Sequence, residues 1–433
     1  MIGFAGLSHL GIVMSLATAA KGFKVVAYDP SPELCKSLDE GQLPVVEPHL
    51  LALLAAARPY MSFSADASCV GRCELVFLSM DTPTGADNLS DVSALSDLID
   101  TVARHAAPET VVVVLSQVPP GFTRRLARRW RREHGGRAVL YYQAETLVFG
   151  CAVERAMEPE RFIVGCEDPG ATLPMVYADL LGAWACPVLR MRYESAELAK
   201  IAINMFLASS VSVTNTLAEL SEAIGAEWCE IVPALRLDRR IGPHAYLAPG
   251  LGLSGGNLER DLATVGQLSR EYGTDAQIIE AWRTNSAHRE SWVLKRLHAE
   301  TLGFDGDPVI AIWGLAYKPN TASVRNSPAF NLVTALAQFP VRAYDPEVVL
   351  PAGAFPNVAR ASSAIDACRG AAALAVMTPW TEFSSVALSE VRNAMTGRVI
   401  VDPFGILDSS VATALGFSYS RLGSPVRDVR PDA

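Results

Sequence analysis

Short apolar runs alternate with amphipathic stretches at both ends of the chain. A strand buried on both faces of a parallel sheet reads as a continuous apolar run of about four to eight residues. We expect a strand at each of seven such runs: Glu74–Met80, Thr110–Leu115, Ala138–Tyr142, Arg161–Val164, Val309–Trp313, Ala372–Met377 and Arg398–Val401. Because helical stretches separate these runs, the pattern predicts a parallel α/β sheet at each end of the chain.

The tetrapeptide Ala-Tyr-Asp-Pro occurs twice, at residues 27–30 and 343–346. Each copy follows an apolar strand that runs into a glycine turn, and then a helical stretch: Ile2–Gly11 with Ile12–Lys21, and Val309–Gly314 with Pro328–Gln338. This order is the opening βαβ unit of a nucleotide-binding sheet. Two such openings far apart predict one nucleotide-binding domain at each end.

The middle of the chain predicts a long helix. Residues Ser195–Ile224 contain no proline or glycine, and Gly225 is placed to end the helix. Apolar residues recur at helical spacing, at Leu198, Ile201, Ala202, Met205, Leu207 and Ala208. We expect this helix to be largely buried, to link the two sheets and to form the core of a homodimer.

The fold class is therefore α/β, with two Rossmann-like nucleotide-binding domains joined by a long central helix and a helical middle region. We place the first domain at residues 1–190, the central dimerisation domain at 191–300 and the second nucleotide-binding domain at 301–433. The last segment, Gly423–Ala433, has turn and charge composition and is expected to be a loose tail.

Composition narrows the class of protein. Half of the 433 residues are hydrophobic and the net charge is −9, so we expect large buried cores and no binding of nucleic acid or an anionic membrane. We interpret the arginines between Arg124 and Arg132 as a solvated helix face. No apolar stretch reaches the ~20 residues that cross a bilayer and no signal peptide is evident, so we expect a soluble cytoplasmic protein.

Eight cysteines are scattered along the chain without a CxxC pair, which is typical of a reducing compartment. Cys69 and Cys73 are four residues apart, but no second cysteine pair or nearby histidine completes a zinc site. We expect no metal site.

The first turn reads Gly6-Leu-Ser-His-Leu-Gly11, a dinucleotide-binding fingerprint whose middle glycine is replaced by Ser8. A serine at this position can still donate a hydrogen bond to a phosphate at a helix N-terminus. Asp29 ends the next strand, where a carboxylate accepts ribose hydroxyls and repels a 2′-phosphate. These residues predict NAD rather than NADP as the cofactor.

Further segments carry a resemblance to one family. They are Gly41-Gln-Leu-Pro44 with Glu47-Pro48, Asp81-Thr-Pro-Thr84, Ser116-Gln-Val-Pro119 with Gly121, Ala144-Glu-Thr-Leu-Val-Phe-Gly150, Ser195–Ala208, Gly250–Asp261 and Gly314–Pro328. In this order, they resemble the motifs of the UDP-glucose/GDP-mannose dehydrogenase family, and they span nearly the whole chain. The resemblance implies two nucleotide-binding domains, NAD as cofactor, a GDP- or UDP-linked sugar as substrate, and a homodimer.

The resemblance also implies catalytic roles. Lys200 and Asn204, which share a helix face because they are four residues apart, match the pair that stabilises a developing alkoxide through a water. Glu145 matches the carboxylate that orients this water or relays a proton, and Asp261 the aspartate that helps to activate it. The alternatives are structural: an interhelical salt bridge and a capped amide for Lys200 and Asn204, a surface carboxylate for Glu145, and a helix-capping carboxylate for Asp261.

The ligand contacts follow from the same motifs. The cofactor contacts implied are Gly6, Ser8, His9, Leu10, Gly11, Asp29, Thr82, Pro83, Gln117 and Arg325. The substrate contacts implied are Glu145, Leu147, Lys200, Asn204, Gly250, Gly252, Gly255 and Lys318. Lys318 would meet the pyrophosphate of the sugar nucleotide, and backbone amides of the run Pro249–Gly256 would close over the sugar.

The chain departs from the family pattern on the substrate side. Asn257 stands where the family has the cysteine that forms a covalent thiohemiacetal, and a carboxamide cannot act as that nucleophile. Other departures are Gln117 for threonine, Glu259 for proline, Arg260 for lysine, Ala322 and Asn326 for acidic residues, and Phe404 for an arginine that reaches the substrate across the dimer. On the cofactor side, we identify only Ser8 as changed.

These features favour a dehydrogenase that oxidises one sugar hydroxyl by two electrons and stops at a carbonyl. A secondary hydroxyl would give a ketone and would make the cysteine superfluous. In this respect the chain is similar to the C6-dehydrogenases of lincosamide antibiotic pathways, which act on a GDP-linked octose. Two alternatives remain open: a four-electron UDP-sugar 6-dehydrogenase that forms a uronate by another route, and a non-catalytic sugar-nucleotide-binding protein.

Overall fold

The computed structural model describes residues 1–85, 89–134, 139–253, 256–302, 306–350 and 353–425. Two compact units divide the chain, Met1–Ile203 and Asn204–Ala433. One helix, α8 (Tyr193–Ile224), continues through the boundary between them.

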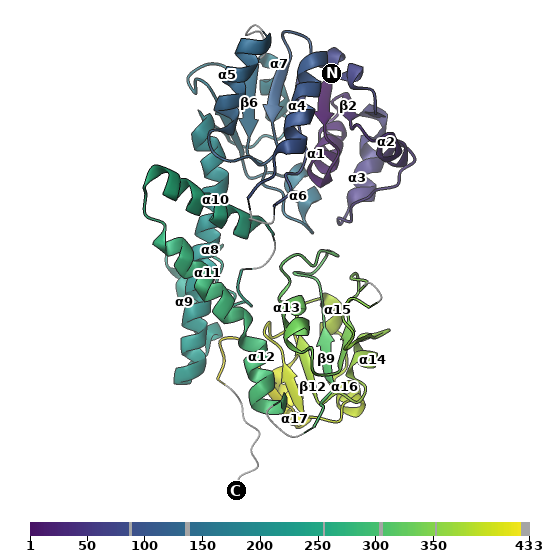
Figure 1. Ribbon diagram of the computed structural model, residues 1–433, viewed down its shortest axis with the longest axis vertical. Helices are drawn as coiled ribbons and strands as arrows, with labels where there is room; N and C mark the ends of the chain where they lie inside the picture. Colours follow the sequence, from purple (N-terminus) through teal and green to yellow (C-terminus); the bar gives the residue numbers. More distant parts are fainter. Residues whose placement is uncertain (86–88, 135–138, 254–255, 303–305, 351–352, 426–433) are drawn as a thin grey trace. The chain divides into compact units, whose positions relative to one another are not determined.

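The first unit is built on an eight-stranded sheet with the order β3-β2-β1-β4-β5-β6-β7-β8 (Figure 1). All neighbouring strands are parallel except β6 and β7. Because the strand order reverses between β1 and β4, the carboxyl ends of these two strands form the crevice in which such sheets bind ligands. The strands are β1 (Ile2–Ala5), β2 (Val25–Tyr28), β3 (Met61–Ser64), β4 (Leu75–Leu78), β5 (Val111–Val114), β6 (Val139–Gln143), β7 (Phe162–Cys166) and β8 (Val188–Arg192).

Helices cover both faces of this sheet. Alternate residues of each strand point to opposite faces. Phe4 and Phe77 join a core with α1, α3, α6 and α7, whereas Ala5 and Leu78 join a second core with α4, α5 and the start of α8. The helices are α1 (His9–Ala20), α2 (Pro32–Asp39), α3 (Leu50–Ala57), α4 (Ser93–His105), α5 (Phe122–His134), α6 (Ala152–Met157) and α7 (Met175–Gly182), with 3₁₀ turns at Arg58–Tyr60 and Ala67–Arg72.

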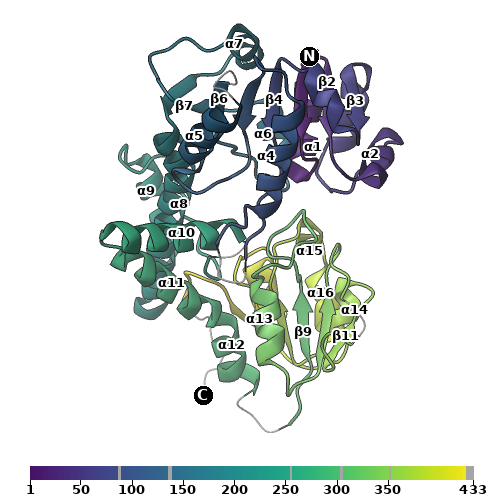
Figure 2. The ribbon, with the colours of Figure 1, turned by 45° about the horizontal axis from the view of Figure 1, so that its top comes forward.

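The second unit contains a six-stranded parallel sheet with the order β11-β10-β9-β12-β13-β14 (Figure 2). Its strands are β9 (Ile310–Trp313), β10 (Val341–Tyr344), β11 (Val358–Arg360), β12 (Ala373–Val376), β13 (Val399–Val401) and β14 (Ser418–Ser420). This order repeats that of the first six strands of the other sheet, so both ends of the chain are Rossmann-like, as predicted.

The remaining helices of the second unit fall into two groups. The helical middle region contains α9 (Trp228–Leu237), α10 (Gly256–Tyr272), α11 (Gln277–Glu290), α12 (Trp292–Leu297) and a π-helical turn at His298–Leu302. Around the sheet lie α13 (Pro328–Ala335), α14 (Ala364–Cys368), α15 (Thr381–Ser384), α16 (Leu388–Ala394) and α17 (Ser409–Ala414).

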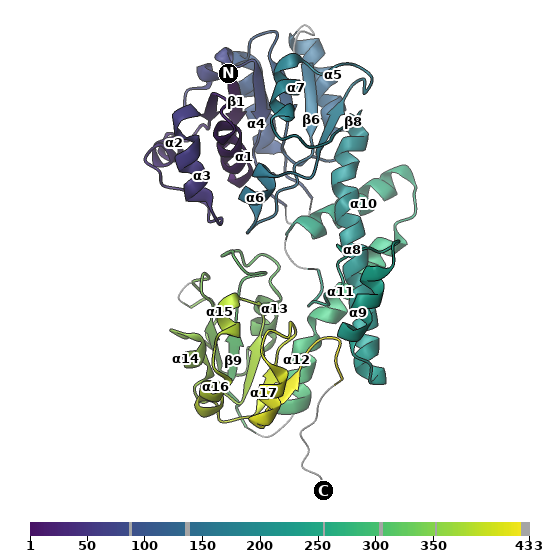
Figure 3. The ribbon, with the colours of Figure 1, turned by 180° about the vertical axis from the view of Figure 1, so that it is seen from behind.

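Helix α8 differs in one respect from the expectation. Helix α8 (Figure 3) has 32 residues and ends at Ile224. The next residue, Gly225, takes the left-handed φ of 83° that the predicted stop requires. The helix is not largely buried, however, because Phe206, Leu220 and Ile224 are exposed. By length and composition α8 could cross a membrane, a property that it shares with core helices of soluble proteins.

The C-terminal segment also differs from the expectation in part. Gly423 donates its backbone N–H to Glu222 (2.8 Å) and accepts from the N–H of Trp228 (2.8 Å), and Ser424 donates to Glu227 (2.6 Å). These two residues are therefore fixed to the helical region rather than loose. The rest of the predicted tail, residues 426–433, lies outside the described residues.

All seven predicted strands are present, with ends within two residues of the expectation. The eight cysteines are all free thiols. Within the described residues, no group of three or more metal-binding side chains is found.

Candidate functional site

The crevice between β1 and β4 is shaped by two glycines of the first turn. Gly6 has a φ of 93°, and a side chain at this position would approach Met80 Cβ to 2.9 Å. A Cβ at Gly11 would lie 1.9 Å from the carbonyl oxygen of Gly6. Both positions therefore require glycine, and their packing brings the N-terminus of α1 against the strand ends, where its amides can meet a phosphate.

Asp29 lies at the end of β2, as predicted, and is buried. Its carboxylate accepts hydrogen bonds from the backbone N–H groups of Leu7 (2.8 Å) and Ser31 (3.0 Å). These bonds join the glycine turn to the second strand and hold the carboxylate where a ribose is recognised in this fold. The glycine turn, the start of α1 and Asp29 thus fit a dinucleotide cofactor.

Asp345, in the second copy of the tetrapeptide, has a different set of partners. It accepts hydrogen bonds from the backbone N–H groups of Leu315, Ala316, Glu347 and Val348 and from the indole of Trp380. With five donors on two oxygens, its acceptor capacity is largely used within the protein. The repeated tetrapeptide therefore places, in both sheets, an aspartate whose hydrogen bonds fix the junction between strand and turn.

Ser8 makes its hydrogen bonds to the end of β4. Its hydroxyl donates to the carbonyl of Ser79 (3.3 Å) and accepts from the N–H of Asp81 (2.8 Å). The proton that we expected Ser8 to offer to a phosphate is thus used by the protein. The φ of −72° at Ser8 is one that any residue adopts, so the glycine of the fingerprint is not required here for conformation.

Asp81 is a residue that the sequence analysis missed on the cofactor side. It is exposed, and its Oδ2 lies 3.5 Å from the backbone nitrogen of Leu10 in the first turn of α1. A carboxylate is thus held beside the amides that bind phosphate in this fold. Ser8 fixes the backbone of Asp81, so the positions of the two residues are coupled.

His9 and the neighbouring loop are joined by a buried carboxylate. Glu47 accepts from His9 Nε2 (2.9 Å) and from the backbone N–H groups of Gly150 (2.9 Å) and Ala152 (3.1 Å). The ring of Phe149 lies 4.3 Å from that of His9, between ring centres. The sequence motif contained Glu47 without a role, and the structure shows that it ties the loop after Glu145 to α1.

Two other predicted cofactor residues meet at the ends of β4 and β5. The hydroxyl of Thr82 donates to the carbonyl of Gln117 (2.7 Å), and Pro83 follows on the exposed side. The loop that carries Gln117 is held by Glu197, a fully buried carboxylate of α8 that accepts from the N–H groups of Gly121 (2.5 Å) and Thr123 (2.8 Å). Burial raises the pKa of Glu197, while these backbone donors oppose the shift.

Glu145 and Lys200 are brought together in the first unit. Lys200 Nζ lies 3.9 Å from Glu145 Oε2, and both side chains are largely shielded from solvent. The other oxygen of Glu145 accepts from the backbone N–H of Leu147. A cavity of about 20 Å³, lined by Glu145, Leu147 and Arg155, adjoins this loop, and its volume is sufficient for one water molecule.

Asn204 and Asp261 are brought together in the second unit. Asn204 Nδ2 donates to Asp261 Oδ2 at 2.6 Å, and Asp261 is 1% exposed. Because the carboxylate accepts the amide hydrogen, the oxygen of the Asn204 amide faces away from Asp261. Asn204 lies one turn after Lys200 on α8, as the sequence predicted.

Asn257, in the first turn of α10, is exposed and accepts a hydrogen bond from Arg260 Nη2 (3.2 Å). Arg260 is buried, and its Nε lies 3.8 Å from Asp261 Oδ1. A chain of contacts therefore runs from Asn204 through Asp261 and Arg260 to Asn257. The sequence named these residues separately and did not predict the link between Arg260 and Asn257.

The glycine-rich loop before α10 is pinned from two sides. Gly250 donates its N–H to Asn215 of α8 (2.8 Å), and Leu253 donates to the hydroxyl of Ser286 (2.8 Å). Gly252 has a φ of 80°, and a Cβ there would lie 2.7 Å from Ser286. The backbone N–H groups of Gly250 and Leu253 thus already donate hydrogen bonds within the protein, so these two groups are not free to donate to a sugar. Gly255 lies outside the described residues.

Glu259 and Glu290 place two carboxylates near this loop. Burial and the charge of Glu290 raise the pKa of Glu259 to about 6, against the opposing effect of Arg325 and Arg283. Burial also raises the pKa of Glu290, which accepts from Ser286 and Asn331. Arg325, predicted to contact the cofactor, thus lies within the electrostatic reach of Glu259 in the second unit.

Lys318 lies in the loop after β9, as predicted from the motif. Its ammonium lies 5.6 Å from the centre of the Tyr317 ring. Gly314, which ends β9, has a φ of 92°, and a Cβ there would lie 2.4 Å from Thr378. This loop therefore leaves the sheet at the β9–β12 reversal, which is the ligand-binding end of the second sheet.

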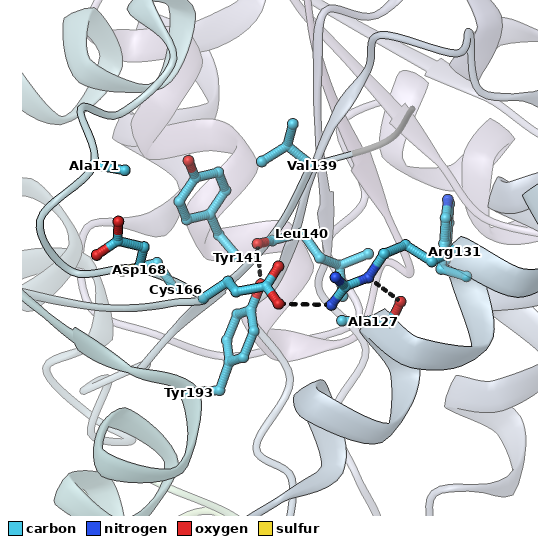
Figure 4. Close-up of a pocket in the computed structure, with 11 residues that line it drawn as sticks. Ala127, Arg131, Val139, Leu140, Tyr141, Cys166, Asp168, Ala171 and Tyr193 are labelled. Carbon is cyan, nitrogen blue, oxygen red and sulfur yellow. Dashed lines mark hydrogen bonds and ion pairs between the residues drawn. The ribbon is translucent and has the colours of Figure 1, made fainter. Parts of the chain in front are cut away.

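A cavity of about 350 Å³ is lined by none of the predicted site residues (Figure 4). It lies where β6 and β7 diverge. Arg131 pairs with Glu167 (2.7 Å) on one side, and the hydroxyl of Tyr193 donates to Leu140 on another (2.7 Å). Arg131 lies on the solvated helix face that the sequence suggested, and both Arg131 and Arg124 of α5 pair with acidic residues.

Comparison with known proteins gives matches along most of the chain. Three models of the UDP-glucose/GDP-mannose dehydrogenase family match: its NAD binding domain at residues 1–181, its central domain at 194–287 and its UDP binding domain at 311–409.

Among curated proteins, a UDP-glucose 6-dehydrogenase from Pseudomonas aeruginosa is 30% identical and covers 97% of this chain and 96% of its own. One from Haloferax volcanii is also 30% identical, over 93% and 96%. Among solved structures, a UDP-glucose dehydrogenase from Pyrobaculum islandicum superimposes with a TM-score of 0.82 at 26% identity, over 93% of each chain.

Proposed function

Because this chain belongs to the UDP-glucose/GDP-mannose dehydrogenase family and is an NAD-dependent nucleotide-sugar dehydrogenase, we propose that it oxidises a single sugar hydroxyl by two electrons and stops at a carbonyl. The proposal rests on the resemblance that puts Asn257 in the place of the family's nucleophile, and on two contacts within the separate units, Lys200–Glu145 and Asn204–Asp261. On this interpretation the groups for a first oxidation are present and the thiol for a second is not.

The first unit supplies the acid–base groups. When bound, NAD would supply the acceptor for the hydride of the carbon that carries the hydroxyl. The ammonium of Lys200, which lies 3.9 Å from Glu145 Oε2, favours the developing alkoxide. Glu145 Oε2, the oxygen that pairs with Lys200, takes up the hydroxyl proton through a water molecule.

The second unit supplies orientation. Asp261, which is buried, holds the partly buried Asn204 amide by a hydrogen bond of 2.6 Å. A polar group in such surroundings is costly unless it is satisfied. The fixed amide oxygen of Asn204 is suited to accept a hydrogen bond from the water or the hydroxyl that loses its proton.

We propose that the substrate hydroxyl is secondary, so that the product is a ketone. A carboxamide cannot form the thiohemiacetal through which an aldehyde is carried to an acid. A ketone has no further hydrogen on its carbonyl carbon, so no second hydride transfer can follow. The loss of the cysteine is then without consequence, whereas a free aldehyde would require immediate removal.

The decisive experiment counts NADH per sugar consumed. Purified enzyme is incubated with NAD⁺ and with UDP-glucose, GDP-mannose or a homologue of each that carries a methyl group on C6, which makes that alcohol secondary. We expect one NADH per C6-methyl sugar and a product lighter by two hydrogens. Two NADH and an acid from any of these sugars would refute the proposal, and the variant Lys200→Met serves as the inactive control.

For the substrate, we propose a GDP-linked octose of the kind oxidised at C6 in lincosamide antibiotic pathways. The support is chemical: its C6 carries a longer chain and is a secondary alcohol, which removes the need for a thiol. The matched family model of the C-terminal domain is described as UDP-binding, so UDP-linked sugars form the alternative arm. Turnover of the UDP-linked C6-methyl sugar in clear preference to its GDP counterpart would contradict the assignment.

We also propose that a second copy of the chain covers one face of α8. Five exposed apolar residues follow the spacing of a helix-packing seam: Phe206, Val213, Leu217, Leu220 and Ile224. The variant Leu217→Glu/Leu220→Glu is expected to change the mass measured by light scattering from a dimer to a monomer. An unchanged mass, or a monomeric wild-type protein, would exclude this interface.

A further inference from the structure

The orientation of the Asn257 amide follows from its partner. Arg260 Nη2 lies 3.2 Å from Asn257 Oδ1. A guanidinium has only donors, so the amide must turn its oxygen to Arg260 and its NH₂ group away. The assignment of oxygen and nitrogen at this side chain is therefore fixed by chemistry and does not depend on a choice between two flips.

Arg260 is a buried side chain that lies close to a second fixed side chain. It is 5% exposed, and its Nε lies 3.8 Å from Asp261 Oδ1, while Asp261 is fixed in turn by Asn204. Asn257 is the exposed end of this chain of contacts. Because Arg260 occupies the oxygen of this amide, the two N–H donors of the exposed Asn257 side chain are left on the side away from Arg260.

We propose that Asn257 donates a hydrogen bond to the sugar oxygen that becomes the carbonyl, and that Arg260 is the positioning residue that keeps this donor turned outward. The inference rests on the proposed function, because it takes residue 257 to lie at the reacting carbon. It assigns a role to Asn257 in place of the nucleophile that this position would otherwise hold.

The electron balance leaves the amide unchanged. The hydride leaves the sugar carbon for NAD⁺, and the hydroxyl proton leaves for water or a carboxylate, so Asn257 transfers neither. Its N–H faces an oxygen whose negative charge grows during the reaction and which ends as a ketone oxygen, a pure acceptor. Asn257 also lies in the first turn of α10, where the partial positive charge of the helix end favours the same oxygen.

The variants Asn257→Asp and Asn257→Ala separate this role from a structural one. Aspartate keeps an oxygen for Arg260 but has no N–H to donate, whereas alanine loses both. If Asn257 only anchors Arg260, the aspartate variant should retain kcat/KM. If it donates to the substrate, both variants should lose kcat/KM by about 10²-fold, the size of effect seen when one oxyanion donor is removed. Thermal unfolding of each variant shows whether the fold is intact.

Arg260 is tested by Arg260→Met and Arg260→Lys. Methionine removes the donors and lets the amide flip, so kcat should fall while KM changes less. Lysine keeps a donor-only group, so it should restore part of the loss. Equal loss in both variants with unchanged unfolding temperatures would overturn the positioning role.

Binding measurements keep this inference separate from the proposed function. With UDP-glucose and GDP-mannose as probes, calorimetry should show that Asn257→Asp weakens binding of a sugar nucleotide to the enzyme–NADH complex, whereas binding of UDP or GDP alone is unchanged. If wild-type enzyme releases one NADH per sugar but Asn257→Asp remains within threefold of it in kcat/KM, the inference fails and the proposed function stands. If wild-type enzyme forms an acid while both Asn257 variants lose activity, the proposed function fails and the inference stands. An unchanged ratio of sugar-nucleotide to diphosphate affinity overturns the inference even without turnover.

Discussion

Asp81 is expected to weaken cofactor binding, and removing its charge should strengthen it. Its Oδ2 lies 3.5 Å from the N–H of Leu10, and Ser8 holds its backbone at 2.8 Å. The N-terminus of α1 is where the pyrophosphate of a dinucleotide binds in this fold. A phosphate oxygen at these amides would therefore meet the carboxylate within a few ångströms. The perturbations are Asp81→Asn, which keeps the shape, and Asp81→Gly.

The magnitude follows from Coulomb's law. Two unit charges about 5 Å apart repel by about 0.8 kcal/mol at the dielectric constant of water, which is about 80. The exposure of Asp81 makes this lower value the suitable one. One phosphate charge then corresponds to about a fourfold change in Kd, and two charges to about a fifteenfold change. Asp81→Asn should therefore bind NAD⁺ about four to fifteen times more tightly.

The assay is calorimetric titration of NAD⁺ at two ionic strengths. The gain should shrink toward zero near about 1 M salt, because the screening length falls to about 3 Å. Glu109→Gln is the matched control, since Glu109 is exposed in the same unit and precedes β5, at the opposite end of the strands. Equal or weaker binding by Asp81→Asn at low salt would refute the argument and would indicate that Asp81 itself holds the cofactor.

Three further predictions concern stability and the loops. Gly252→Ala should lower the unfolding temperature more than Gly242→Ala, because both glycines have positive φ (80° and 86°) but only a Cβ at Gly252 meets Ser286 within 4 Å; equal effects in calorimetry would count against the packing argument. The fold raises the pKa of Glu259 to about 6, so its protonated form contributes stability that is complete below the unfolded value of 4.5 and is lost as pH rises through about 6. Glu259→Gln should therefore flatten the change in unfolding temperature between these two pH values. At pH 7 this variant should be more stable than the wild type by about 1 kcal/mol, a figure that allows for the partial exposure of the side chain. Glu197→Ala should destabilise the first unit by about 2–4 kcal/mol, because it leaves two backbone donors without their carboxylate, and limited proteolysis should then cut near residues 117–123; an intact loop would contradict this.

The sheets could be predicted because their signal is local. A strand covered on both faces is apolar along its whole length, so an apolar run such as Val111–Val114 predicts a strand. The turn glycines could also be predicted from the sequence, because Gly6 and Gly11 leave no room for a side chain against the strand ends. Edge strands with exposed residues, such as β3 and β8, lack this signal and were not predicted.

The burial of α8 could not be predicted in the same way. Its apolar composition indicated a core helix, but composition does not tell which apolar side chains face the rest of the chain and which face outward. The structure leaves Phe206 and Ile224 exposed and buries the carboxylate of Glu197. Contacts made between distant segments, and not the pattern along the helix, decide which residues are covered.

The sequence by itself determined the two nucleotide-binding openings and the position of Asp29 at the end of a strand, because each depends on residue type and short spacing. Only the tertiary structure decided that Asp81 lies beside the amides of α1 and that Glu47 ties the loop after Glu145 to α1. The physical reason is the directional nature of hydrogen bonds. The sequence gives the type of each donor and acceptor, but its partner is settled only when folding brings the two groups within about 3 Å.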